Sequence, residues 1–166
     1  MTNSGILEMS KNQVGLAGEF YVLAQLTHRG YVATLTLGNT KGVDILVTNP
    51  ELNTLFKVEV KATHKKPRRE RLFGGEEMLY IWAMSEKHES LHDDKLIYCF
   101  VHLPSPNEMP KYFIVPSKTV ADYVKWQHEH WLSTRTREVN PTTMRNFRIK
   151  VSDPDGYADN WGVFAQ

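Results

Sequence analysis

Residues 55–62 read Leu-Phe-Lys-Val-Glu-Val-Lys-Ala, and residues 42–47 before them read Gly-Val-Asp-Ile-Leu-Val. Both segments have the composition of β-strands, because branched apolar residues recur between breaks rich in Gly, Asn and Pro. Alternate side chains of a strand share a face, so Glu59 and Lys61 project together while the valine between them packs behind. Asp44 comes from the neighbouring strand, about 5 Å away. The two segments predict a sheet that gathers two carboxylates and one amine.

This combination of side chains indicates a type of chemistry. Two carboxylates that converge from adjacent strands form a hard oxygen site suited to Mg²⁺. A neighbouring amine can orient or deprotonate a metal-bound water. We therefore expect metal-dependent hydrolysis of a phosphodiester bond.

The composition is that of one globular domain. The chain has 166 residues, of which 41% are hydrophobic and 23% charged, enough for a single core. The formal net charge is only +1, so affinity for a polyanion must come from a local concentration of basic residues. Residues 57–71 provide it, with seven Lys or Arg against two Glu, whereas residues 76–94 carry six acidic residues against one Lys.

The sequence predicts a cytoplasmic location. The single cysteine, Cys99, lies in the apolar run at residues 96–101, which favours a buried thiol in a reducing compartment. The first ten residues lack both a basic region and a long apolar region. No stretch approaches the roughly 18 apolar residues that would span a membrane. Secretion and membrane insertion are therefore disfavoured.

The periodicity of the chain predicts its elements. Apolar residues recur at helical spacing over residues 12–29, and Gly30 favours a helix end there. Three successive antiparallel strands are expected at residues 31–37, 43–48 and 55–63. A mobile basic loop follows at residues 64–77.

The second half of the chain continues the same alternation. Strands are expected at residues 79–83, 96–103 and 112–115, then a helix from a capping Ser117 to about Trp131 and a basic tail. The predicted fold class is α/β (α+β), with a mixed β-sheet of five or six strands flanked by helices.

Three short motifs follow one another along the chain: Gly18-Glu19 in the first helix, Gly42-Val43-Asp44 and Glu59-Val60-Lys61. In order and spacing they resemble the motifs of the PD-(D/E)xK nuclease superfamily. The run Gly-Leu-Ala-Gly-Glu at residues 15–19 is similar to archaeal Holliday-junction resolvases and cyanobacterial homing-endonuclease relatives. Val43 stands where the superfamily has proline, at a permissive position.

The resemblance implies a restriction-endonuclease-like fold in a single PD-(D/E)xK nuclease-like domain over residues 1–166. Its motif-bearing core would be at about residues 13–115, and its C-terminal helix and basic tail at about residues 117–166. The motifs themselves lie within residues 13–63. The strand at residues 112–117, which leads into a helix, is similar to the second half of small members of the superfamily.

The resemblance also implies a metal-dependent DNA endonuclease that leaves a 5′-phosphate. Asp44 and Glu59 would hold one or two Mg²⁺ ions, with Mn²⁺ as a substitute, and the backbone carbonyl of Val60 would be a further oxygen ligand. Lys61 would poise the attacking water and offset the charge of the transition state. Glu19 would support this site or bind a second metal.

DNA is the expected partner, and basic residues outside the metal site would hold its phosphates without reading sequence. A homodimer is a further expectation, with Tyr80, Trp82 or residues 126–131 supplying the contact. The candidate DNA contacts are Lys65, Lys66, Arg68, Arg69, Arg71, Arg135, Arg137, Arg145 and Arg148.

Two alternatives stay open. The domain could keep the nuclease fold and act as a catalytically silent DNA-binding or partner-interaction module. Residues 88–92, His-Glu-Ser-Leu-His, also fit the H-E-x-x-H pattern of zinc peptidases. The polar surroundings of that segment, between two predicted strands, favour a surface turn.

Overall fold

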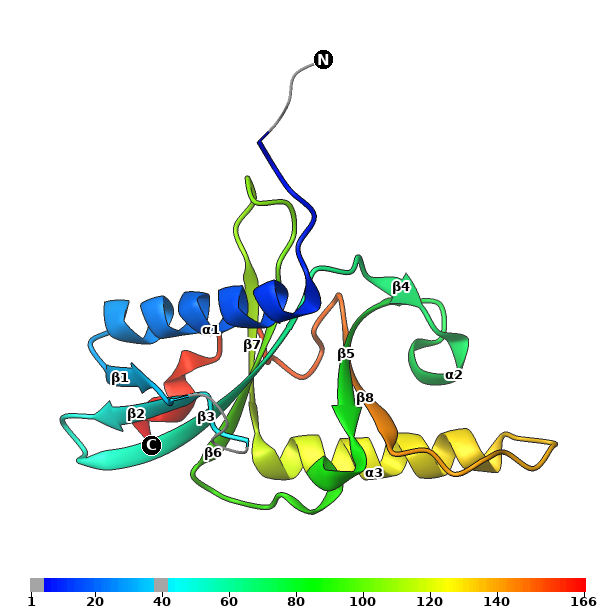
Figure 1. The fold of residues 1–166 in the computed structure, drawn as a ribbon. Helices are drawn as coiled ribbons and strands as arrows, with labels where there is room; N and C mark the ends of the chain where they lie inside the picture. Colours follow the sequence, from blue (N-terminus) through cyan, green and yellow to red (C-terminus); the bar gives the residue numbers. More distant parts are fainter. Residues whose placement is uncertain (1–4, 38–41) are drawn as a thin grey trace.

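The computed structural model describes residues 5–37 and 42–166. Helices and strands alternate along the chain, and Figure 1 shows their arrangement. The elements are α1 (Lys11–His28), β1 (Val32–Leu35), β2 (Ile45–Asn49), β3 (Thr54–Thr63), β4 (Arg68–Arg69), α2 (Arg71–Gly74), β5 (Met78–Ser85), η1 (Glu86–Ser90), β6 (Leu96–His102), β7 (Lys111–Pro116), α3 (Ser117–Ser133), β8 (Met144–Lys150) and η2 (Trp161–Ala165).

The main sheet has five strands in the order β1-β2-β3-β6-β7. The strands β1, β2 and β3 pair antiparallel in succession, as the sequence predicts. The strand β6 then pairs parallel with β3, and β7 pairs antiparallel with β6. A separate antiparallel sheet has the order β4-β5-β8. The expected α+β class with a mixed sheet is confirmed.

Helix α1 covers one face of the main sheet (Figure 1). It begins at a capping box, in which the Ser10 hydroxyl accepts a hydrogen bond from the Gln13 amide and the Gln13 side chain accepts one from the Ser10 amide. It ends before Gly30, whose φ of +88° suits glycine. Val22 and Leu26 of α1 are fully buried in this first core.

The opposite face of the main sheet packs against the small sheet and α3. This second core is aromatic: Phe100 of β6 stacks on Phe147 of β8, with ring centroids 4.5 Å apart. Trp82 of β5 is 1% exposed and Tyr80 is also buried, so neither forms the dimer contact that the sequence suggested. Trp126 on α3 is exposed, and the homodimer stays a prediction.

Three local expectations differ from the structure. Residues 64–77, expected as a mobile basic loop, contain the short elements β4 and α2. The tail contains β8, which pairs with β5 along its length. Ser117 does not cap α3, because its hydroxyl donates to the Asp93 carbonyl and accepts from the Asp93 amide. No helix among residues 5–37 and 42–166 combines the length and apolar character needed to cross a membrane.

Gly18 lets α1 approach β3, and its replacement should destabilise the fold. A Cβ at Gly18 would lie 2.6 Å from the Ala62 Cβ, well inside contact distance. We expect Gly18→Ala to lower the free energy of unfolding by about 1–3 kcal/mol through overpacking. Gly15→Ala, on the same helix with open space around its Cβ, should raise it by up to about 1 kcal/mol. Urea denaturation measures both, and equal effects would contradict this role of Gly18.

Candidate active site

The register of β2 and β3 places Asp44 beside Glu59. Ile45 pairs with Val58, so the residue before β2 lies opposite the next residue of β3. The Val60 amide donates a hydrogen bond of 2.7 Å to Asp44 Oδ2. Asp44 is therefore hydrogen-bonded to β3 twice, because its own amide also donates to the Val58 carbonyl.

Glu59 is buried in the middle of the molecule, with only 2% of its surface exposed. Its Oε1 atom lies 2.5 Å from Lys61 Nζ and 3.2 Å from Nε2 of His88. Its Oε2 atom is buried and has no hydrogen-bond partner among the described residues. A Cβ at Gly42 would lie 3.4 Å from Oε2, which places this oxygen beside the segment that carries Asp44.

The surroundings of the site shift the pKa values of its three acidic residues in different directions. Burial opposes ionisation of Glu59, but the His88 hydrogen bond and the Lys61 ammonium lower the pKa of Glu59 to about 2. Burial raises the pKa of Asp44, a backbone amide opposes this rise, and the Glu59 charge adds to it. Burial and the Asp44 charge raise the pKa of Glu19 on α1. Glu59 is thus the firmly ionised member.

The four residues predicted from sequence lie in one region. Asp44, Glu59 and Lys61 share one face of β2 and β3, and Glu19 is close enough for the Asp44 charge to raise its pKa. Within residues 5–37 and 42–166, however, no three His, Cys, Asp or Glu side chains form a ready-made metal cage. Binding of a metal through Glu19 therefore stays a prediction.

His88 is the site residue that sequence reasoning missed. The 3-10 helix η1 turns this side chain inward, where it is 3% exposed and contacts Glu59. Its only sequence signal was the zinc-peptidase pattern at residues 88–92. That pattern does not form a zinc site: His92 is exposed beside Asp122, and Glu89 pairs with Arg145. The expectation of a surface turn is correct only for part of the segment.

A cleft of about 600 Å³ opens next to Lys61. It lies between the beginning of α1, the end of β3 and the strands β5 and β8. No Asp or Glu is among the described residues that line it. Its basic side chains are Lys11, Lys61, Lys65, Lys66 and Arg68.

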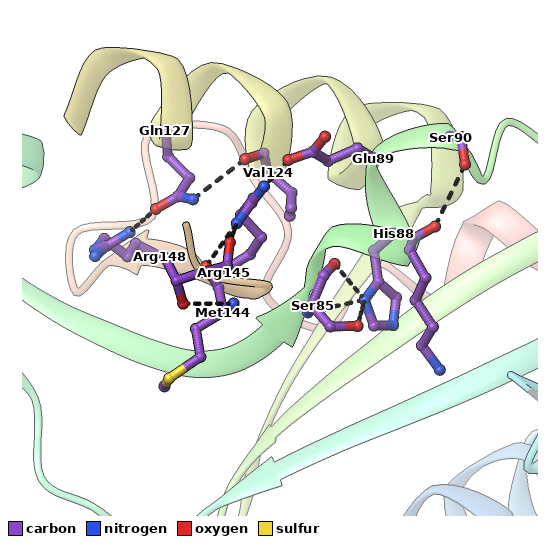
Figure 2. A network of polar contacts seen from close by, with 11 residues as sticks. Ser85, His88, Glu89, Ser90, Val124, Gln127, Met144, Arg145 and Arg148 are labelled. Carbon is purple, nitrogen blue, oxygen red and sulfur yellow. Dashed lines mark hydrogen bonds and ion pairs between the residues drawn. The ribbon is translucent and has the colours of Figure 1, made fainter. Parts of the chain in front are cut away.

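The basic residues predicted to contact DNA divide into two groups. Arg145 and Arg148 are buried beneath α3, where Arg145 pairs with Glu89 and Arg148 donates to Gln127 (Figure 2). Arg148 pairs with Glu70 as well. Arg148 also lies 3.7 Å from the Phe73 ring centroid. The structure gives these two arginines a role in packing β8 and not an exposed surface for phosphates. The other candidates are accessible, and they are Lys65, Lys66, Arg68, Arg69, Arg71, Arg135 and Arg137.

The overall arrangement has a counterpart among solved structures. The chain is similar to the structure of the bacterial homing endonuclease I-Ssp6803I, with a TM-score of 0.54 and 12% sequence identity over 93% of each chain. It shares the fold of that nuclease. No family model and no curated protein matches the sequence. At 12% identity the likeness concerns the fold alone, so the site must be argued from its own residues.

The ionised Asp44 side chain should destabilise the folded protein, because it is partly buried. Its raised pKa means that folding disfavours the ionised form, a penalty that is absent in acid and complete above the raised pKa. An asparagine at this position could still accept the hydrogen bond of the Val60 amide. We expect Asp44→Asn to raise the Tm at pH 8 in EDTA, with the gain vanishing as the pH falls below 3.8, the ordinary pKa of aspartate. A lower Tm at pH 8 would contradict this expectation.

Proposed function

We propose that this protein is a metal-dependent DNA endonuclease of the PD-(D/E)xK type. The observation that carries the proposal is the pairing of Asp44 with Glu59 across β2 and β3, with Lys61 on the same face as Glu59. The fold shared with a homing endonuclease supports it. Two adjacent carboxylates at buried strands have little use in packing, since burial of charge is costly.

The residues present fit a divalent cation that prefers oxygen. The buried Oε2 atom of Glu59 lacks a hydrogen-bond partner among the described residues, so a bound cation would satisfy it. The Val60 amide faces Asp44, and its carbonyl is on the same side of the strand, past the end of β2. Asp44, Glu59 and the Val60 carbonyl would hold the cation.

A bound Mg²⁺ or Mn²⁺ would supply Lewis-acid activation of a phosphodiester and of water. Lys61 contributes a positive charge beside the carboxylates. Its Nζ atom lies at Glu59 and its side chain is partly exposed toward the basic cleft, so its ammonium can reach from the site toward a bound phosphate. Its positive charge offsets negative charge that develops during hydrolysis.

The cleft beside Lys61 provides the route for DNA. Its four other lysine and arginine side chains come from α1 and from the segment after β3. Such residues neutralise phosphates and release counterions, so binding should weaken as salt rises. Arg135 and Arg137 are further exposed basic residues, just after the end of α3.

The decisive experiment measures cleavage by the purified chain. Linear, supercoiled, single-stranded and four-way-junction DNA are incubated with Mg²⁺, with Mn²⁺ and with EDTA. Asp44→Asn is the matched control, because it keeps the backbone hydrogen bond and removes the charge. We expect cleavage that needs the metal and is lost in the variant. DNA that is bound but never cut by the wild type would instead indicate a silent DNA-binding module.

A further inference from the structure

His88 is held on both sides of its imidazole ring. On one side, Nδ1 lies 3.1 Å from the Ser85 amide, 3.1 Å from the Ser85 hydroxyl and 2.9 Å from the Ser85 carbonyl (Figure 2). On the other side, Nε2 lies 3.2 Å from Oε1 of Glu59. The ring edge packs against Tyr98 of β6, with centroids 6.0 Å apart. A side chain with this many contacts has one orientation.

The contact with Glu59 fixes the place of a proton. A carboxylate oxygen only accepts, so a hydrogen bond to Glu59 requires a proton on Nε2. On the other side of the ring, the contacts of Nδ1 with the Ser85 backbone and hydroxyl hold the imidazole in the orientation that points Nε2 at Glu59. The capping turn of η1 thus sets the orientation of His88, and His88 presents Nε2–H to Glu59.

Lys61 and His88 contact the same oxygen of Glu59. They meet Oε1, whereas Oε2 lies toward the Gly42 segment and has no hydrogen-bond partner with normal geometry among the described residues. Tyr98 is the neighbour of Glu59 on β6, and burial together with the Glu59 charge raises the pKa of Tyr98. Lys61 alone is a weak constraint, since its chain is long and partly exposed. The rigid imidazole on η1 adds a second hydrogen bond, which restricts rotation of the Glu59 carboxylate.

We propose that His88 is a positioning residue that locks the Glu59 carboxylate through Nε2–H, so that Oε2 faces the Asp44 side of the site. The consequence for metal binding rests on the proposed function, whereas the orientation itself is a property of the chain alone. Partners that orient metal-binding groups typically change metal affinity or activity by about 10- to 100-fold when removed. His88 would act in this way through Glu59.

Two amide replacements separate positioning from simple packing. In His88→Gln the amide nitrogen can take the place of Nε2 and still donate to Glu59. In His88→Asn the shorter amide takes the place of Nδ1, keeps the contact with Ser85 and cannot reach Glu59. Titration calorimetry with Mn²⁺ should show about 10- to 100-fold weaker binding for the Asn variant and near wild-type binding for the Gln variant. Equal affinities in all three proteins would overturn the proposal, as would the reverse order.

A second measurement needs neither metal nor cleavage. Long-range ¹H–¹⁵N correlation spectra of the metal-free protein at about pH 7.5, above the ordinary pKa of histidine, report which ring nitrogen of His88 carries the proton. A protonated Nε2 supports the lock on Glu59, and a bare Nε2 with the proton on Nδ1 excludes it. If the wild type neither binds Mn²⁺ nor cuts DNA, the proposed function fails, and this spectrum still decides the role of His88.

Discussion

Exchange of Glu59 for glutamine should reduce DNA cleavage at least about 10²–10³-fold without unfolding the protein, the size of effect seen when one essential charge-stabilising group is removed from an active site. The glutamine side chain has the same shape and an oxygen that accepts from His88, so the local packing remains. It lacks the charge that a divalent cation needs. Single-turnover cleavage of the preferred DNA substrate measures the loss, and circular dichroism monitors the fold.

Lys61→Met is the companion to this variant. Methionine keeps the apolar stem beside the cleft and removes the ammonium, so cleavage should fall to a similar extent while Mn²⁺ still binds. Lys66→Met, in an exposed residue of the same cleft, is the matched control and should weaken DNA binding only. Cleavage at the wild-type rate in Glu59→Gln or Lys61→Met would remove the proposed active site.

The second large effect concerns the buried ion pair beneath α3. Arg145 is 4% exposed and its guanidinium also donates to the carbonyls of Thr142 and Met144. Glu89→Leu would leave this cation without its carboxylate. We expect the free energy of unfolding to fall by about 3 kcal/mol, because an uncompensated buried charge is costly. Urea denaturation measures the change.

The double variant Glu89→Leu with Arg145→Met tests the cause. Replacing both charges with apolar groups of similar size is often neutral, so most of the lost stability should return. Glu76→Ala breaks the exposed pair with Arg71 and should have no measurable effect. A double variant less stable than Glu89→Leu would show that the loss comes from packing or from the backbone contacts of Arg145 and not from the unpaired charge.

The elements predicted from sequence were those with strong local periodicity. Helix α1 and the strands β3, β6 and β7 lie close to their predicted bounds, because their apolar residues repeat at the spacing of a helix or form short apolar runs. The strand β8 was missed because its alternation includes arginines, which suggested an exposed basic tail. Only the pairing with β5, and the carboxylates of Glu70 and Glu89, make these arginines suitable for the interior.

The sequence by itself determined that Glu59 and Lys61 share a face of one strand, since alternation is a local property of extended backbone. It also indicated Asp44 on the adjacent strand through the short connection between β2 and β3. Only the tertiary structure decided that His88 completes the environment of Glu59. That contact joins residues 29 positions apart through the packing of η1 against the main sheet, and no periodic pattern encodes such a distance. The burial of Arg145 and Arg148 was decided in the same way, because it depends on carboxylates that other elements bring beneath α3.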